Sequence, residues 1–259
     1  MIHGHWLAEH DLEGSYERID VPPAEAAAFI ARLRAGEFVG GNVTVPNKEV
    51  VLSLLDEVSE TARAMGAANT LWMQDGRLHG DNTDAYGFLA HLDACVPGWG
   101  ERTRTALILG AGGAARAVIH GLAGRGLRRI LLVNRSPERA VELAALFPGT
   151  VEARPWQDAA GLVGESDLIV NTTSLGMHGQ PPLEIDLSTL RTGAIVDDIV
   201  YVPLETPLLA EARRRGGIPV DGLGMLLHQA VPGFERWFGI RPQVTAELRA
   251  KLEIDIPRV

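Results

Sequence analysis

The feature that most constrains the fold is a glycine-rich turn between a short apolar strand and a helix. Residues 105–109 have the apolar pattern of a buried parallel strand, and Gly110-Ala111-Gly112-Gly113-Ala114-Ala115 follows at once. Helical spacing continues over 116–125, and 129–133 form a second apolar strand. This order predicts one βαβ unit whose glycines lie where the first strand turns into the helix.

Each small residue of this turn has its own physical reason. Gly110 allows a tight turn, and Gly112 lets the backbone approach a pyrophosphate. Gly113 and Ala115 let helix and strand pack closely, while the helix N-terminus offers free N–H groups and a positive dipole end. A glycine-rich turn in another kind of α/β protein is the alternative. Strand, helix and following strand together favour a dinucleotide site.

The residues after the second strand predict which dinucleotide binds. NAD sites usually place Asp or Glu here, which accepts a hydrogen bond from the ribose 2′-hydroxyl. This chain has Asn134-Arg135-Ser136, with Arg139 one helical turn further on. Two guanidinium groups and a hydroxyl suit a 2′-phosphate, so we expect NADP(H). Two solvated surface arginines are the alternative.

Composition narrows the functional class. A chain of 259 residues is long enough for two modest domains, and a net charge of −9 without a basic run argues against a nucleic-acid partner. No apolar run reaches membrane-spanning length, and no signal peptide precedes the first predicted helix. The single cysteine, Cys95, excludes an internal disulfide, and the histidines lack metal-ligand spacing. We expect a cytoplasmic protein with a buried Cys95 thiol and no metal. The sequence does not decide the oligomeric state, and a homodimer is compatible with it.

The rest of the pattern predicts an α/β protein of two domains with a cleft between them, the second a Rossmann-type doubly wound domain. The predicted bounds are 1–84 plus 230–259 for a substrate-binding domain, 85–102 for a connecting helix and linker, and 103–229 for the NADP domain. Predicted helices cover 1–10, 22–34, 48–56, 59–65, 85–95, 207–215, 223–238 with an interruption near Pro232, and 244–252. Predicted strands outside the βαβ unit cover 16–21, 39–45, 67–73, 77–79, 150–153, 168–171 and 194–197.

Polar side chains gather at the predicted strand ends of the first domain. Ligands of open α/β sheets bind beyond the carboxyl ends of strands, so these groups would converge if their strands are neighbours. They are Thr44, Lys48, Asn69 and Asp84. A lysine beside an aspartate can hold a substrate oxygen, stabilise its negative charge and exchange a proton. Solvation of Lys48 at a helix start, and helix capping by Asp81 or Asp84, are the alternatives.

Two segments of the second domain also carry polar or flexible residues. Thr173 lies among small polar residues after the strand at 168–171, where it could line the nicotinamide ribose. The run from Asp221 through Gly222 and Gly224 to Met225 is typical of a tight turn entering a helix, and Gln229 follows Met225 by one helical turn. An ordinary capped helix explains this second segment nearly as well.

Taken together, these segments resemble the shikimate dehydrogenase family over almost the whole chain. The blocks that carry the resemblance are 42–49, 66–70, 80–84, 110–115, 134–136, 171–177 and 221–229. The resemblance implies reversible, NADP-dependent reduction of 3-dehydroshikimate to shikimate. This reaction belongs to the chorismate pathway of aromatic amino acid biosynthesis.

The resemblance also implies roles for individual residues. Lys48 would be the catalytic lysine and Asp84 its partner on the substrate hydroxyls. The implied substrate ligands are Thr44, Asn69, Tyr201 and Gln229. The implied cofactor contacts are Gly110, Ala111, Gly112, Gly113, Ala114, Asn134, Arg135, Ser136, Arg139, Thr173, Gly222, Gly224 and Met225.

The chain departs from the family pattern in two places. Asn47 stands where family members usually have histidine. The family opens with a strand and a Ser-x-Ser turn whose hydroxyls bind the substrate carboxylate, whereas residues 1–6 match the helix after that motif. Either the start lies inside a longer gene product, which the intact downstream motifs favour, or the chain is a degenerate member. We expect weak shikimate binding by the 259-residue chain.

Two other functions are compatible with the sequence. A quinate/shikimate dehydrogenase using NAD would share these motifs, although Arg135 and Arg139 favour NADP. A truncated, non-catalytic NADP-binding relic would retain the glycine turn. Such a relic would need neither Lys48 nor Asp84.

Overall fold

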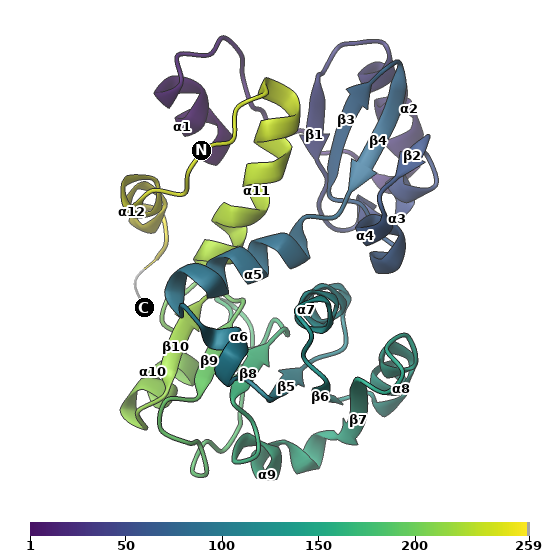
Figure 1. The fold of residues 1–259 in the computed structure, drawn as a ribbon. Helices are drawn as coiled ribbons and strands as arrows, with labels where there is room; N and C mark the ends of the chain where they lie inside the picture. Colours follow the sequence, from purple (N-terminus) through teal and green to yellow (C-terminus); the bar gives the residue numbers. More distant parts are fainter. Residues whose placement is uncertain (258–259) are drawn as a thin grey trace. The chain divides into compact units, whose positions relative to one another are not determined.

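The computed structural model describes residues 1–257, which divide into two compact units (Figure 1). The first unit comprises Met1–Asp84 and Leu227–Leu252, so the chain leaves it and returns near the C-terminus. The second unit comprises Ala85–Leu226 with the segment that starts at Glu253. Among residues 1–257, no helix combines the length and apolarity needed to span a bilayer.

The first unit is built on a four-stranded mixed sheet in the order β1-β3-β4-β2. Its strands are β1 Gly40–Asn42, β2 Glu57–Val58, β3 Thr70–Gln74 and β4 Arg77–Asp81. β3 pairs antiparallel with β1 and β4, and β2 pairs parallel with β4. Asp75 and Gly76 connect β3 to β4 with positive φ at both residues, as a tight Asp-Gly hairpin turn requires.

Helices cover both faces of this sheet. They are α1 Ile2–Glu9, η1 Pro23–Glu25, α2 Ala26–Arg34, α3 Asn47–Leu52, α4 Glu60–Met65, α11 Leu223–Phe238 and α12 Ala246–Ile254. On one face, Ile30 and Leu33 of α2 pack with Val51, Leu71 and Leu78 in a dry core. Because strand residues alternate between faces, Thr70 and Trp72 of β3 point away from this core.

The other side of the unit holds an aromatic cluster, which we define as His3, Trp6, Tyr16, Phe234 and Trp237. Trp237 donates its indole N–H to the Leu71 carbonyl at 2.8 Å. A Cβ atom on Gly40 would lie 2.1 Å from that indole nitrogen, so only glycine permits the contact. The cluster thereby fastens α1 and the end of α11 to the first two strands of the sheet.

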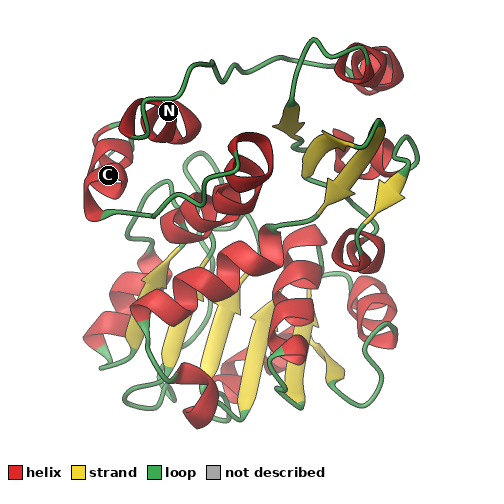
Figure 2. Cartoon of the chain, turned by 45° about the horizontal axis from the view of Figure 1, so that its top comes forward, coloured by secondary structure: helices red, strands yellow, loops and turns green. Residues whose placement is uncertain are grey.

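The second unit contains a six-stranded parallel sheet in the order β10-β9-β8-β5-β6-β7, visible as yellow arrows running in one direction in Figure 2. Its strands are β5 Thr105–Leu109, β6 Arg129–Asn134, β7 Val151–Pro155, β8 Leu168–Asn171, β9 Ile195–Asp198 and β10 Ile218–Asp221. This is the doubly wound order, whose direction of winding reverses between β5 and β8. Ligands of such sheets bind at that reversal.

Helices flank this sheet on both faces and create two cores. They are α5 Asp84–Cys95, α6 Trp99–Arg102, α7 Gly113–Gly124, α8 Pro137–Ala145, η2 Trp156–Asp158, α9 Ala159–Val163 and α10 Pro207–Arg214. Ile108 of β5 belongs to the core under α5, α7 and α8, whereas its neighbour Leu107 belongs to the core under α9 and α10. Burial on both faces explains the unbroken apolar runs of the central strands.

Three expectations were wrong and one segment differs from its expected form. Residues 16–21 form no strand: the Asn47 amide donates to the Val21 carbonyl at 2.6 Å, so a side chain replaces strand pairing. α11 passes through Pro232 without interruption, because its packed apolar face outweighs the lost hydrogen bond. Cys95 is exposed rather than buried. Residues 96–104 contain α6 and bury Val96 and Trp99.

Candidate active site

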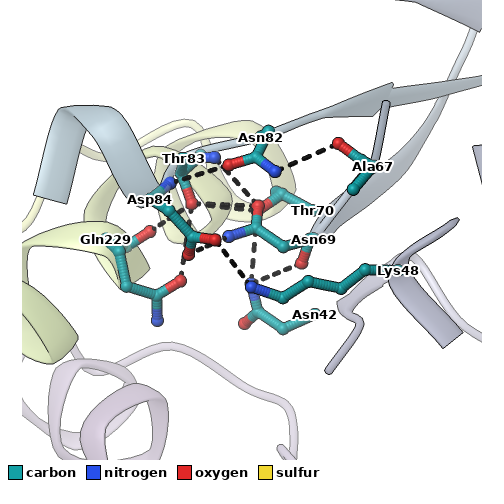
Figure 3. Close-up of polar contacts among 9 residues, drawn as sticks. All are labelled: Asn42, Lys48, Ala67, Asn69, Thr70, Asn82, Thr83, Asp84 and Gln229. Carbon is teal, nitrogen blue, oxygen red and sulfur yellow. Dashed lines mark hydrogen bonds and ion pairs between the residues drawn. The ribbon is translucent and has the colours of Figure 1, made fainter. Parts of the chain in front are cut away.

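Lys48 and Asp84 form an ion pair, with 2.6 Å between Nζ and Oδ2 (Figure 3). Lys48 is the second residue of α3 and Asp84 the first of α5, so two helix N-termini bring the charges together. A cation in a first helical turn opposes the helix dipole, and the carboxylate offsets that penalty. The side chains are 25% and 18% exposed, so a small ligand can reach both.

Asn69 fixes the other carboxylate oxygen of Asp84. Its amide nitrogen donates to Asp84 Oδ1 at 2.8 Å, and its amide oxygen accepts the backbone N–H of Thr83 at 2.9 Å. Because a backbone N–H can only donate, the oxygen of Asn69 must face Thr83 and its NH₂ must face Asp84. Asp84 therefore accepts from two different donors, Asn69 and Lys48.

The capping role is carried by neighbours of Asp84. Asn82 Oδ1 accepts the backbone N–H of Asp84 at 3.1 Å, and its amide donates to the Ala67 carbonyl at 3.0 Å. Asp81 Oδ1 accepts the backbone N–H of Asn82 at 2.7 Å. Asn82, rather than Asp81 or Asp84, therefore accepts the backbone N–H at the start of α5, and the carboxylate of Asp84 is directed at Lys48 and Asn69.

The other predicted substrate residues differ in their relation to this group: Gln229 contacts Thr83, Thr44 precedes α3, and Tyr201 belongs to the second unit. Gln229 approaches Thr83, whose hydroxyl lies 2.8 Å from the Gln229 carbonyl and 3.4 Å from its side-chain oxygen. Thr44 lies in the turn before α3, where its carbonyl accepts the backbone N–H of Asn47 at 2.9 Å. Tyr201 follows β9 in the second unit and is 37% exposed. The contacts of these residues with a substrate stay predictions.

The basic residues of the chain add weight to Lys48. Lys48 and Lys251 are the only lysines among 24 basic residues. Arginine thus serves almost everywhere that this chain needs a cation, including most of its surface ion pairs. A lysine is retained at the position where the side chain faces Asp84. Lysine can serve as a proton donor in catalysis, whereas the guanidinium group of arginine stays protonated.

The second unit has a cavity of about 710 Å³ at the reversal point of its sheet. Its lining contains Gly110, Ala111, Gly112, Asn134, Arg135, Arg139, Trp156, Thr172, Thr173, Ser174, Leu175, Pro181, Pro182 and Glu184. The glycine turn, the residues after β6 and the loop after β8 all meet there. The cofactor residues that line it are Gly110, Ala111, Gly112, Asn134, Arg135, Arg139 and Thr173.

The glycine turn combines one crowded glycine with two that face open space. Gly110 has φ of +105°, and a Cβ there would lie 2.8 Å from the methyl carbon of Thr173, so no other residue fits without displacement. A Cβ on Gly112 or Gly113 would meet no atom within 4 Å, so the backbone faces open space at the start of α7, and the expectation that Gly113 serves close packing of helix and strand was wrong. Free N–H groups at this helix start suit an anion.

Of the polar residues that follow β6, one has a structural role and the others are exposed. Asn134 accepts the backbone N–H of Ala111 at 3.1 Å and donates to the Ser136 carbonyl at 2.9 Å, so it braces the glycine turn. Arg135 and Arg139 are exposed, and within residues 1–257 neither forms an ion pair. The Ser136 hydroxyl makes no capping bond to α8. The contact of Arg135, Ser136 and Arg139 with a 2′-phosphate stays a prediction.

The remaining predicted cofactor residues lie outside the cavity lining. Gly113 and Ala114 open α7. A Cβ on Gly222 would lie 2.1 Å from the Ile199 carbonyl oxygen, and one on Gly224 would lie 1.9 Å from His91 Nδ1, so close packing alone requires both glycines. Met225 packs against the core under α7. Their approach to a nicotinamide stays a prediction.

Sequence reasoning missed several residues of both sites. Asn42, Thr70 and Thr83 connect to Asn69 through hydrogen bonds, although the sequence shows them only as polar residues within predicted blocks. Trp156 and Glu184 line the cavity. Trp156 follows β7 directly, and its place at the carboxyl end of a parallel strand is the signal that could have found it.

A doubly wound sheet with a glycine turn and an arginine pair, joined to a unit that presents a lysine–aspartate pair, defines a nicotinamide-dependent dehydrogenase. The chain belongs to the shikimate dehydrogenase family. Residues 1–71 match its substrate binding domain, 99–178 match shikimate / quinate 5-dehydrogenase, and 222–250 match the shikimate 5′-dehydrogenase C-terminal domain.

Relatives of known name agree over nearly the full chain. Shikimate dehydrogenase (NADP(+)) from Methylobacterium radiotolerans is 59% identical over 99% of this chain and 92% of its own length. The enzyme of that name from Azorhizobium caulinodans is 55% identical over 99% of this chain and 91% of its own length.

Solved structures share the fold. Shikimate 5-dehydrogenase from Thermus thermophilus, in complex with NADP(H) and shikimate, aligns with a TM-score of 0.84 at 38% identity, covering 93% of this chain and 88% of that one. Quinate dehydrogenase from Corynebacterium glutamicum, in complex with NAD, aligns with a TM-score of 0.88 at 32% identity, covering 97% and 92%.

Proposed function

We propose that this chain catalyses the reversible, NADP-dependent reduction of 3-dehydroshikimate to shikimate, a step of the chorismate pathway. The observation that carries the proposal is the Lys48–Asp84 ion pair, held by Asn69 and open to a small ligand. The relatives named shikimate dehydrogenase (NADP(+)), at 55% and 59% identity, support the same reaction.

The cavity of the second unit suits NADP(H). Gly110–Gly112 and the start of α7 would bind the pyrophosphate, while Arg135, Ser136 and Arg139 would bind the 2′-phosphate. Bound NADPH supplies the hydride for carbonyl reduction. These residues contribute binding energy and orientation, and none of them takes part in proton transfer.

The first unit would supply the proton and the position of the substrate. Lys48 would donate a hydrogen bond, and then a proton, to the carbonyl oxygen that becomes the hydroxyl. Asp84 would accept hydrogen bonds from Lys48 and from a substrate hydroxyl, which keeps the ammonium group in place. Asn69, Thr44 and Gln229 would bind the remaining hydroxyls of the ring. Positioned proton transfer of this kind accelerates reactions by about 10²–10⁴-fold.

The structural match to an NAD-bound quinate dehydrogenase makes quinate oxidation the second candidate. Arg135 and Arg139 argue against NAD, since a 2′-hydroxyl offers them no charge to bind. The deciding experiment assays purified chain with shikimate and with quinate, each in the presence of NADP+ and of NAD+. We expect the highest kcat/KM for shikimate with NADP+. A preference for quinate with NAD+ would overturn the proposal.

A non-catalytic, NADP-binding relic makes a different prediction in the same assay. It would bind NADP+ and oxidise neither substrate. The intact contact between Lys48 and Asp84 argues against this function, because a protein that only binds NADP needs neither residue.

A further inference from the structure

The hydrogen bonds around Lys48 and Asp84 continue away from the site into the aromatic cluster. We propose that His3 and Tyr16 are positioning residues for the Lys48–Asp84 pair, acting through Asn42. Both donate to Asn42, and Asn42 in turn donates to the Asn69 carbonyl and to the Thr70 hydroxyl, next to the bond from Asn69 to Asp84. The inference rests on the proposed function for its kinetic consequence, and its structural consequence is independent of turnover.

The outer end of the network has one allowed orientation. Asn42 directs its NH₂ group at the Asn69 carbonyl, 3.2 Å away, and a carbonyl can only accept. The side-chain oxygen of Asn42 must therefore face the other way. There it lies 2.8 Å from the Tyr16 hydroxyl and 3.0 Å from His3 Nε2, so both of these groups donate to it.

The burial and the hydrogen bond of His3 fit this role. Burial lowers the pKa of His3 to about 4, partly opposed by the hydrogen bond to Asn42, so the ring is neutral near neutral pH. Its single N–H is then on Nε2, and within residues 1–257 the buried Nδ1 has no hydrogen-bond partner. An unpaired buried nitrogen is unfavourable, and a phenylalanine would fill this apolar place without it. What the histidine adds is the Nε2–H bond to Asn42.

The aromatic cluster holds the two donors rigidly. The ring centroids of His3 and Tyr16 are 4.1 Å apart, and the Trp237 ring lies 5.2 Å from His3 and 6.0 Å from Tyr16. His3 is 4% exposed. Packed rings leave the two donors little freedom, so the aromatic cluster determines the position of the Asn42 side chain.

The inner end converts this orientation into the position of Asp84. The Asn42 amide also lies 3.3 Å from Thr70 Oγ1, and the Thr70 hydroxyl donates to Asn69 Oδ1 at 3.0 Å. Thr83 Oγ1, 3.3 Å from Thr70 Oγ1, is a competing partner for that hydroxyl. By donating to both the Asn69 carbonyl and Thr70 Oγ1, Asn42 holds these two residues in place where Asn69 donates to Asp84 (Figure 3).

The kinetic test compares variants that remove a donor with variants that keep it. Tyr16→Phe and His3→Phe each remove one hydrogen bond while filling the same space, and His3→Gln keeps an N–H near the position of Nε2. We expect kcat for shikimate oxidation to fall about three- to tenfold in each phenylalanine variant, the size of one hydrogen bond. KM for NADP+ should not change, and His3→Gln should recover most of the activity.

Two control variants separate positioning from stability. Ser15→Ala removes an exposed hydroxyl bond to Glu17 from the residue next to Tyr16. Ile30→Val weakens the core on the opposite face of the same sheet. Both variants should keep the wild-type kcat. The Tm of Ile30→Val should be equal to or lower than that of Tyr16→Phe, so that a loss of stability alone is matched by the control. A kcat loss in Ile30→Val equal to that in Tyr16→Phe would reduce His3 and Tyr16 to a structural role and overturn the inference.

A spectroscopic readout tests the same inference without turnover. Because Lys48 and Lys251 are the only lysines, isotope-labelled lysine gives one signal from the site and one reference signal from the exposed Lys251. In NMR spectra, the chemical shifts of the Lys48 signal should change in Tyr16→Phe and His3→Phe, but not in His3→Gln or Ser15→Ala. An unchanged Lys48 signal in both phenylalanine variants overturns the inference. Absence of shikimate oxidation by the wild type overturns the proposed function instead.

Discussion

The two sites of this protein are built in opposite ways. In the first unit, the Lys48–Asp84 pair is positioned by hydrogen bonds from neighbouring groups of the protein, with Asn69 bonded to both Asp84 and Thr83. In the second unit, the cavity presents backbone N–H groups at a glycine turn and two exposed arginines without carboxylate partners within residues 1–257.

This difference reflects what each site must do. Proton transfer needs an accurately placed donor, which a closed network of hydrogen bonds provides. Cofactor binding needs donors that stay unpaired until a phosphate arrives, which an open loop and solvated guanidinium groups provide. Proton transfer thus belongs to the first unit and cofactor choice to the second in the proposed function, and the two should be separable by mutation.

Loss of Lys48 should have the largest effect and should change turnover without changing cofactor binding. We expect Lys48→Ala to lower kcat about a thousandfold, or about 4 kcal/mol in activation free energy, because the proton donor is gone. NADPH affinity, measured by fluorescence titration, should equal that of the wild type. Lys251→Ala is the matched control and should keep full activity. A Lys48→Ala variant that also loses NADPH binding would show that the two functions are not separable.

The buried histidine should make the first unit sensitive to acid. The pKa of His3 is lowered from 6.5 to about 4 by burial, so below pH 6.5 the unfolded chain binds a proton that the folded chain excludes. Stability should fall as pH drops from 6.5 toward 4, by up to about 3 kcal/mol. Urea unfolding across this range tests it, and His3→Gln should flatten the loss. An equal loss in His3→Gln would assign the acid sensitivity to other groups.

Loss of an arginine should have the converse effect to loss of the lysine. We expect Arg135→Ala to raise KM for NADP+ about ten- to a hundredfold, the value of a charge-assisted hydrogen bond to phosphate, with kcat little changed. KM for NAD+ should stay the same, because NAD+ lacks the 2′-phosphate. Steady-state kinetics with both cofactors measure this. Equal losses for NADP+ and NAD+ would mean that Arg135 does not contact the 2′-phosphate.

A buried carboxyl should give the second unit the opposite pH response. Burial, with the neighbouring Asp198 and Asp221, raises the pKa of Asp197 well above 3.8. Its Oδ2 has no hydrogen-bond partner within residues 1–257. The folded chain then keeps a proton that the unfolded chain releases, so stability falls as pH rises above 3.8.

Asp197→Asn removes that titration while keeping the volume. We expect a gain in unfolding free energy at neutral pH, where the unfolded wild type releases the Asp197 proton, and less gain in acid, where folded and unfolded chains both keep it. The gain should be small because the asparagine amide is also buried. Urea unfolding at neutral and at acid pH measures the difference. A gain of the same size at both values would contradict the assignment to Asp197.

The sequence predicted the second unit better than the first. The bounds of β5, Thr105–Leu109, and β8, Leu168–Asn171, agree residue for residue with the prediction, because strands buried on both faces leave unbroken apolar runs. β10 was missed because Pro219 disfavours a strand, although an edge strand tolerates it. Residues 16–21 were misassigned because their polar partners lie far along the chain, such as Asn47 at Val21.

The candidate site could be predicted in part for a similar reason. Lys48, Asn69 and Asp84 were expected to converge because they follow predicted elements, and the structure brings them together. The contribution of Asn42 depends on strand pairing with Thr70, and that of His3 on the packing of α1 against α11. Contacts of this kind depend on tertiary structure and leave no local pattern in the sequence.

The central claim is that this chain reduces a carbonyl with a proton from Lys48 and NADPH as cofactor. The most direct measurement follows NADPH absorbance when 3-dehydroshikimate is added to the wild type and to Lys48→Ala. The account predicts NADPH consumption with equal formation of shikimate by the wild type, and almost none by the variant at equal NADPH occupancy. NADPH that binds to the wild type but is not consumed, or equal rates in the two proteins, would contradict it.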